Sequence, residues 1–208
     1  MLRAAASLIA PPLCALCAEP CEYVDSICRH CERKVARLYP VRDEIGGLEI
    51  WSAAKYDGVA RDIVTKMKFA QRLTLAEVAA ERMLRTVGAG RRIYCVPVPP
   101  SPARHRARGF DLAYALARLI AGECRGQTIL CLERDDGPRQ VGRGREERKS
   151  DPPTIRPINV SVPLLSDDVW LVDDVATTGS TLNACAEVLL SQYGAKRVRA
   201  LTFARADK

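Results

Sequence analysis

Residues 169–182, VWLVDDVATTGSTL, decide the fold predicted for this chain of 208 residues. Four apolar residues in succession, 169–172, are typical of a strand that is buried on both faces of a parallel sheet. Such a strand carries Asp173 and Asp174 at its carboxyl end, the edge at which open α/β sheets bind their ligands. We therefore expect a binding site directly after this strand.

A turn rich in small and hydroxyl residues follows the acid pair and leads into a helix predicted over residues 181–193. Backbone N–H groups, hydroxyls and the helix dipole converge in such a turn, so a phosphate group can bind there without a lysine. The candidate phosphate-binding residues are Ala176, Thr177, Thr178, Gly179, Ser180 and Thr181.

Asp173 and Asp174 would repel a phosphate unless the ligand also offers hydrogen-bond donors, and ribose hydroxyls are such donors. Both acids are therefore candidate ribose-binding and catalytic residues. An acid pair after an apolar strand also marks the magnesium-binding strand of ATPases, but the glycine-rich Walker A loop required there is absent from the sequence. A plainer alternative is that the acids cap a turn and the hydroxyl residues cap a helix.

The rest of the chain alternates strand and helix patterns, which predicts an α/β fold with a parallel sheet flanked by helices. The predicted strands cover residues 48–56, 93–98, 129–132, 169–173 and 197–204, and the predicted helices cover 59–69, 75–87, 110–121 and 181–193. A domain boundary is expected after Gly46 and Gly47, which would separate a module of residues 1–47 from a domain of residues 48–208.

Five of the nine cysteines crowd into residues 14–31, which favours a metal site over disulfide bonds. Two C-x-x-C pairs stand ten residues apart, a spacing that lets four thiolates surround one zinc ion. The predicted zinc ligands are Cys14, Cys17, Cys28 and Cys31. Cys21 is an alternative ligand, and His30 is expected to point away. The segment is too short and polar to bury a core, so metal binding would stabilise it.

The net charge of +7 and the pI near 9.0 favour anionic partners such as phosphates, nucleotides or nucleic acid. The excess is spread along the chain, so charge alone does not choose among them. No stretch approaches the roughly 18 apolar residues that a membrane span requires, and we expect none.

Two further segments are candidates for binding anions. The predicted strand that ends near Pro99 and Ser101 is followed by Arg104, Arg106 and Arg108, whose planar forks suit phosphate oxygens unless they form a merely solvated turn. The polar stretch 133–163 is expected to be a flexible lid that excludes water, or else a solvated loop. The candidate lid contacts are Gln140, Arg143, Arg145 and Arg148.

The sequence resembles a known family in several places. Residues 169–182 look like the phosphoribosyl-pyrophosphate (PRPP) motif of type I phosphoribosyltransferases, an apolar strand, two acids and then T-T-G-S/A-T. Over nearly the whole chain, the order of motifs is similar to that of the ComF/GntX family of competence-related phosphoribosyltransferase-like proteins. The other matching motifs are Pro11-Pro12 before Cys14, Tyr56-Asp57-Gly58, Lys68-Phe69, Pro97-Val98-Pro99 and Arg108-Gly109-Phe110.

This resemblance implies a type I phosphoribosyltransferase-like domain, preceded by a zinc ribbon, that uses Mg²⁺ with PRPP. It implies a pyrophosphate loop containing Pro99, Ser101, Arg106 and Arg108, and a catalytic role for Arg148 in the lid. The family's role in DNA uptake and natural transformation implies a cytoplasmic protein at the inner face of the cell membrane, with single-stranded DNA and a competence helicase as partners.

The sequence departs from the family pattern at Asp111, at Asp151 and before Gln140, which bears on acceptor recognition and turnover. The sequence therefore leaves two alternative functions. The first is a PRPP-dependent transferase that releases pyrophosphate. The second is a non-catalytic adaptor that senses a nucleotide or PRPP and docks to DNA or a protein through its zinc module.

Overall fold

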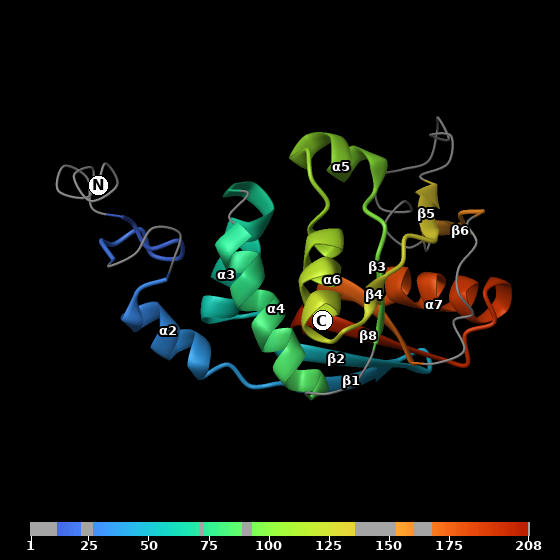
Figure 1. The fold of residues 1–208 in the computed structure, drawn as a ribbon, viewed down its shortest axis with the longest axis horizontal. Helices are drawn as coiled ribbons and strands as arrows, with labels where there is room; N and C mark the ends of the chain where they lie inside the picture. The colour runs from blue at the N-terminus through green and yellow to red at the C-terminus, as the bar shows by residue number, and fades with distance from the viewer. Residues whose placement is uncertain are drawn as a thin grey trace.

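The computed structural model describes residues 12–21, 27–70, 73–88, 93–135, 153–159 and 168–207. Its centre is a six-stranded sheet (Figure 1). In spatial order the strands are β1 (Val41–Ile45), β2 (Leu48–Lys55), β8 (Arg197–Arg205), β7 (Asp168–Ala176), β3 (Tyr94–Pro97) and β4 (Gln127–Thr128). All neighbours in this sheet are parallel except β1 and β2, which form an antiparallel hairpin.

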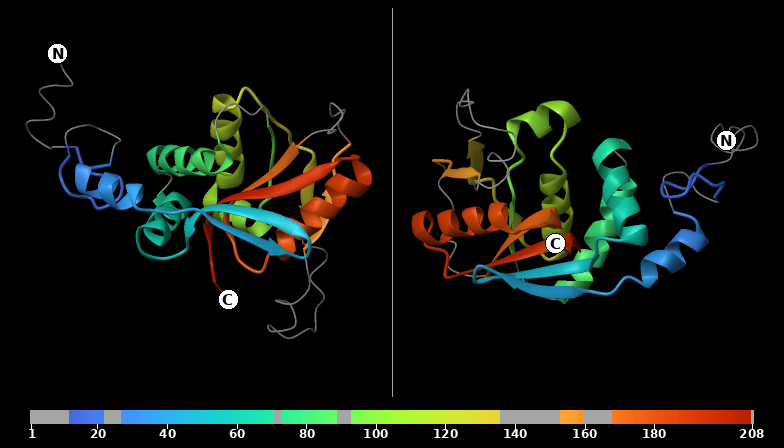
Figure 2. Two further views of the ribbon diagram at one scale, coloured as in Figure 1. Left: turned by 90° about the horizontal axis from the view of Figure 1, so that it is seen from below. Right: turned by 180° about the vertical axis from the view of Figure 1, so that it is seen from behind.

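Helices cover both faces of the sheet, which confirms the predicted α/β fold class. The described helices are α2 (Arg29–Ala36), α3 (Gly58–Ala70), α4 (Leu73–Val87), α5 (Pro102–Arg108), α6 (Leu112–Glu123) and α7 (Ser180–Gln192). The core on one face joins α3, α4 and α6 to the sheet, and the core on the other face joins α7. Figure 2 shows α2 beside α3 at one end of the molecule and α7 at the other.

Strand β7 explains why the sequence is so apolar at this point. Trp170 and Val172 belong to the core under α4 and α6, whereas Val169 and Leu171 belong to the core under α7. All four side chains are fully buried. A strand in the middle of a covered sheet needs apolar residues on both sides, as the sequence predicts.

The predicted strand 129–132 is wrong. The main sheet takes only β4 from this region, and the next strand, β5 (Leu132–Asp135), pairs antiparallel with β6 (Thr154–Pro157) in a separate two-stranded sheet. Ile129 and Cys131 are buried by side-chain packing, with Leu130 exposed between them. Only the ends of the apolar run contact strands: the N–H of Ile129 donates a hydrogen bond of 2.9 Å to the carbonyl oxygen of Cys95 on β3, and Leu132 is the first residue of β5.

The two-stranded sheet is fastened to α7 by Tyr193. Its hydroxyl lies 2.8 Å from the carbonyl oxygen of Cys131 and 2.7 Å from that of Ile158. Strands β5 and β6 fall inside the stretch 133–163 that was predicted as a lid. Most of that stretch lies outside the described residues, with Gln140, Arg143, Arg145 and Arg148 among them.

The sheet begins before the expected domain boundary at residue 47. β1 ends at Ile45, and the turn at Gly46 and Gly47 leads directly into β2, so the two glycines close a hairpin within the sheet. Among the described helices, none is long and apolar enough to cross a membrane.

Candidate functional site

A cleft of about 470 Å³ lies at the carboxyl ends of β7 and β3. This is the edge that the sequence predicts for ligand binding. Ten of the predicted site residues line the cleft, namely Asp173, Asp174, Ala176, Thr177, Thr178, Gly179, Ser180, Thr181, Pro99 and Ser101. The chain thus brings the acid pair, the hydroxyl-rich turn and the end of β3 together around one cavity.

The hydroxyl-rich turn joins β7 to the start of α7. Gly179 occupies the N-cap position of α7 in the left-handed region, with φ 75°, and, having no side chain, it makes no side-chain cap to the first N–H groups of the helix. The hydroxyls of Thr178 and Ser180 lie 2.8 Å apart. A helix N-terminus without a side-chain cap, flanked by hydroxyl groups, is suited to bind an anion such as phosphate.

The β1–β2 hairpin supports this turn from behind. A Cβ atom on Gly179 would lie 2.9 Å from Cγ2 of Ile45, so only glycine fits without displacing the hairpin. The side-chain amide of Asn183 donates hydrogen bonds to the carbonyl oxygens of Ile45, at 3.0 Å, and Gly179, at 3.1 Å. The turn is therefore packed against β1 as well as covalently joined to α7.

Arg205, at the end of β8, also supports the turn. Its buried guanidinium donates hydrogen bonds to the carbonyl oxygens of Thr177, at 2.7 Å, Ala176, at 3.3 Å, and Ala206. Its Nε lies 2.8 Å from the carboxylate of Asp43 on β1, and this arginine lowers the pKa of the Asp43 carboxyl. The backbone at the start of the hydroxyl-rich turn is thereby fixed to both β8 and β1.

The two acids, Asp173 and Asp174, differ in their contacts. Asp174 is 9% exposed, and its carboxylate lies 2.5 Å from Nζ of Lys68 on α3. Asp173 accepts a hydrogen bond of 2.8 Å from the backbone N–H of Asp174. Burial raises the pKa of the Asp173 carboxyl well above its ordinary value, and the charge of Asp174 adds to this rise.

Not all of the basic residues predicted for phosphate binding lie at the cleft. The segment after Ser101 is the short helix α5 and not a loop. Arg106, on this helix, is exposed and does not line the cleft. The side chains of Arg104 and Arg108, and the whole of Arg148, lie outside the described residues. Among the side chains that are described, the basic ones lining the cleft are Lys68 and Arg134.

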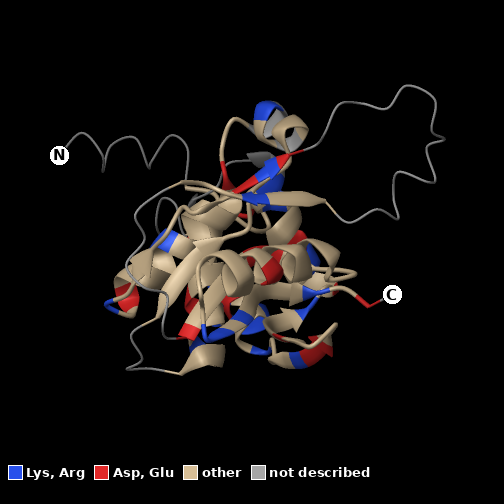
Figure 3. Cartoon of the chain, turned by 90° about the vertical axis from the view of Figure 1, so that its right-hand side faces the viewer, with Lys and Arg blue, Asp and Glu red and all other residues tan. Residues whose placement is uncertain are grey.

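Basic and acidic segments are interspersed over the described residues in the view of Figure 3, in agreement with the even spread of charge along the sequence. The cleft itself combines carboxylates with a turn that is suited to bind an anion. Hard oxygen ligands next to a phosphate position are the donor set that Mg²⁺ takes when it is bound with a phosphorylated substrate.

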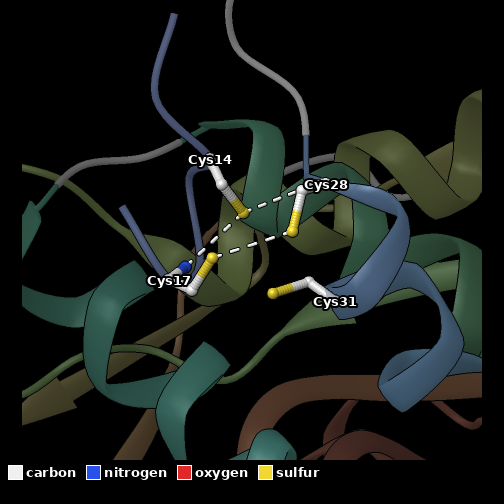
Figure 4. A group of neighbouring side chains, drawn as sticks. All are labelled: Cys14, Cys17, Cys28 and Cys31. Carbon is white, nitrogen blue, oxygen red and sulfur yellow. Dashed lines mark hydrogen bonds between the residues drawn. The ribbon is translucent and has the colours of Figure 1, made fainter. Parts of the chain in front are cut away.

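Four cysteine side chains converge at the other end of the chain (Figure 4). The Sγ atoms of Cys14, Cys17, Cys28 and Cys31 all lie within 4.8 Å of one another, so the group can hold a metal ion. Those of Cys17 and Cys28 are 3.7 Å apart. A tetrahedral zinc site with Zn–S bonds of about 2.3 Å places its sulfurs about 3.8 Å apart, a separation that the Cys17–Cys28 pair matches.

The backbone of the module stabilises a thiolate at Cys14. Burial alone would raise its pKa, but backbone N–H groups of Cys17, Cys28 and Leu16 hydrogen-bond to its Sγ and lower the pKa to about 6. Such N–H···S bonds orient and charge the ligands of a metal site. Among the described residues, Cys21 is outside the cluster, and His30 is exposed.

Comparisons with known proteins agree with the motifs. No protein-family model matches the chain. Competence protein ComFC of Bacillus subtilis (strain 168) is 25% identical over 202 residues, which cover 93% of this chain and 78% of that protein. Competence protein ComFC of Streptococcus pneumoniae (strain ATCC BAA-255 / R6) is 28% identical over 151 residues, 72% of this chain and 65% of that protein, just under two thirds of its length.

This chain is similar in sequence to the ComFC competence proteins over most of its length. The resemblance to the ComF family that the motifs indicate is thereby confirmed. Among solved structures, a hypoxanthine phosphoribosyltransferase from Staphylococcus aureus is 13% identical, with a TM-score of 0.33 over 72% of this chain and 66% of that one.

Sequence reasoning missed three residues of the cleft and its support. Lys68 and Arg134 line the cleft, and Arg205 supports the turn from beneath it. Lys68-Phe69 stands out only as a motif, with no role attached to it. Only one weak indication points to Arg205: it is an arginine at the end of a strand in which nearly all other residues are buried.

Proposed function

We propose that this protein binds PRPP, or a related phosphorylated ribose, and transfers its phosphoribosyl group with release of pyrophosphate. The observation that carries the proposal is the meeting of Asp173 and Asp174 with the turn 176–181 in one cleft. A turn that suits phosphate, next to carboxylates that suit hydroxyl donors, matches the two ends of a ribose 5-phosphate.

The residues take the following roles in the proposal. Residues 177–181 hold the 5′-phosphate, and the acid pair accepts hydrogen bonds from the ribose hydroxyls. Pro99 and Ser101, just after β3, face the pyrophosphate. Arg106 takes no part in holding it, because it lies outside the cleft, and the Arg108 side chain is outside the described residues. Arg148 would reach the site from the stretch 133–163, acting as a lid.

The reaction breaks the bond between the anomeric carbon and the pyrophosphate oxygen, and a nitrogen of the acceptor forms the new bond to that carbon. Mg²⁺, bound with PRPP, would supply positive charge for the departing pyrophosphate. The chain's own contribution is to orient the ribose through Asp173 and Asp174 and to hold the phosphate at the α7 N-terminus.

The cysteine cluster is proposed to hold one structural zinc ion in a module that ends before β1, so the phosphoribosyltransferase-like domain begins with that strand, whereas the sequence predicts that it begins at residue 48. The relatives' name, Competence protein ComFC, supports a place in DNA uptake and natural transformation. In that role the protein would be cytoplasmic and act at the inner face of the cell membrane.

One observation favours a second candidate function, a non-catalytic adaptor that binds single-stranded DNA or a helicase partner through the cysteine module. Helix α2, which carries Cys31 of the cluster, exposes Arg29, His30, Arg33 and Lys34. A basic exposed helix is an electrostatic footprint for a nucleic-acid backbone. In this role PRPP, or a nucleotide, would bind as a signal and would not be consumed.

The two candidates are separated by pyrophosphate release from PRPP and Mg²⁺ in the presence of a panel of bases and amines. The transferase is expected to release pyrophosphate with at least one acceptor, and Asp174→Asn is expected to abolish the release. PRPP binding without release by the wild type across the panel would favour the adaptor. Salt-dependent binding to single-stranded DNA, lost in Arg33→Gln/Lys34→Gln, would support the adaptor's DNA role.

A further inference from the structure

Lys68 occupies an unusual place in the cleft. It stands on α3, more than a hundred positions before the acid pair in the sequence, and its Nζ lies 2.5 Å from the Asp174 carboxylate. The side chains of Lys68 and Asp174 are 21% and 12% exposed. Two charged groups this close and this well buried are screened far less by salt than a surface pair.

The position of Lys68 is fixed by the packing of α3. The inner face of the helix is fully buried against the sheet through Ala60, Ile63, Val64 and Met67. The residue after Met67 emerges at the edge of that core, beside the carboxyl end of β7, where it lines the cleft. Lys68 is therefore held toward the acid pair by a rigid element and not by a loop.

The contact between Lys68 and Asp174 changes the charge balance of the cleft. Two adjacent carboxylates would repel the phosphate that the turn 176–181 is built to bind, and would attract a free divalent cation. A fixed cation between α3 and β7 reduces both effects. Lys68 also lowers the pKa of Asp173, opposing the rise that burial and Asp174 cause.

We propose that Lys68 is a positioning residue for the acid pair, which holds Asp174 in place and cancels part of the pair's charge so that a phosphorylated ribose can enter without a metal ion already bound. This inference rests on the proposed function for the ligand, but the interaction between Lys68 and Asp174 can be tested separately. In this role Lys68 acts through Asp174 and does not itself contact the phosphate.

The test measures two ligands at low salt and pH 8, with zinc-loaded protein. The probes are inorganic phosphate and Mn²⁺, and the variants are Lys68→Met, Lys68→Arg and Lys66→Met. Lys66 lies on the same helix, so Lys66→Met removes the same charge two residues away. A double variant, Lys68→Met/Asp174→Asn, removes both partners of the pair.

Lys68→Met is expected to weaken phosphate binding about tenfold and to tighten Mn²⁺ binding by a similar factor, because one positive charge next to the carboxylates is lost. Lys68→Arg and Lys66→Met should stay within about twofold of the wild type for both probes. The double variant should recover phosphate binding and lose the gain in Mn²⁺ affinity, because the charge being balanced is gone.

Opposite changes for the two probes separate this role from a merely structural one, which would weaken both. A double variant that still binds phosphate poorly would mean that Lys68 contacts the phosphate directly, and the inference would be overturned. If the wild type binds no phosphate, the proposed function fails. Mn²⁺ binding then still tests the inference about Lys68. A gain in Mn²⁺ affinity confined to Lys68→Met supports the inference, and equal Mn²⁺ affinities of Lys68→Met and Lys66→Met overturn it.

Discussion

The guanidinium of Arg205 donates a hydrogen bond of 2.7 Å to the backbone carbonyl oxygen of Thr177. Thr177 is the first residue of the turn between β7 and α7, and Arg205 is the last residue of β8. The shape of the proposed phosphate site thus depends on a side chain that lies beneath the turn and does not line the cleft.

Replacing Arg205 by methionine is expected to lower the free energy of unfolding by about 2–4 kcal/mol, because buried carbonyl groups and the Asp43 carboxylate lose their partner. Urea unfolding followed by circular dichroism measures the change. The matched control is Arg197→Met, also on β8, whose exposed ion pair with Glu49 at 2.6 Å should matter far less. Equal effects of the two substitutions would contradict the role given to Arg205.

Gly179→Ala tests the contact between the turn and β1. The added methyl group meets the Ile45 side chain at 2.9 Å, in a backbone conformation of φ 75° that already disfavours alanine. We expect unfolding to become easier by about 2–3 kcal/mol, of which about 1 kcal/mol comes from the backbone alone. Phosphate binding, measured by titration calorimetry, should fall as well.

Gly47→Ala is the control for this substitution. Gly47 has a φ of 81°, but a Cβ atom there would meet nothing within 4 Å. It should show the backbone penalty and leave phosphate binding unchanged. If Gly179→Ala were no more harmful than Gly47→Ala, the turn would not be packed against Ile45 in solution.

The raised pKa of Asp173 predicts a pH dependence of stability. The folded protein holds the proton on this carboxyl more tightly than the unfolded chain does, so stability falls as pH rises from the ordinary aspartate pKa of about 3.9 toward the raised value. The Asp173→Asn variant lacks this carboxyl, so its stability does not fall in this way. The difference in unfolding free energy between the variant and the wild type should therefore grow with pH, by at most about 1.4 kcal/mol per pH unit.

Urea unfolding at several values between pH 5 and pH 8 measures this difference. Asp62→Asn serves as the control, because Asp62 is exposed on the outer side of α3. The Asp62 variant should track the wild type at every pH. A constant difference between Asp173→Asn and the wild type would show that the Asp173 carboxyl is already ionised throughout this range.

The cysteine cluster predicts one zinc ion per chain. Cys17→Ser is expected to lose most of the bound zinc, as measured by elemental analysis after dialysis, because an alcohol is a poor zinc ligand compared with a thiolate. Cys21→Ser should retain it. Loss of zinc from the Cys21 variant alone would instead make Cys21 the ligand.

The central part of the fold could be predicted because local pattern and tertiary position agree there. The apolar run 169–172 has one stable environment, the middle of a covered sheet, and that placement carries Asp173 and Asp174 to the ligand edge. The two C-x-x-C pairs are equally local, since their spacing alone brings four sulfurs together. In both cases the decisive residues are neighbours in the sequence.

The rest of the site depends on contacts that no local pattern encodes. Lys68 reaches Asp174, and Arg205 reaches Thr177, only after α3 and β8 have packed beside β7. The antiparallel strand β1 was missed for a similar reason. Its alternating exposure leaves a weak apolar pattern, and its pairing with β2 is what makes it a strand.

The hairpin sets a practical limit on how the cysteine module can be studied. A protein shortened to begin at residue 48 would lose β1 together with the module. The truncated chain would leave the edge of β2 unpaired, Arg205 without Asp43, and Gly179 without Ile45 against it. A shortened protein that begins at residue 41 retains all three contacts, so its comparison with the full chain isolates the contribution of the metal module.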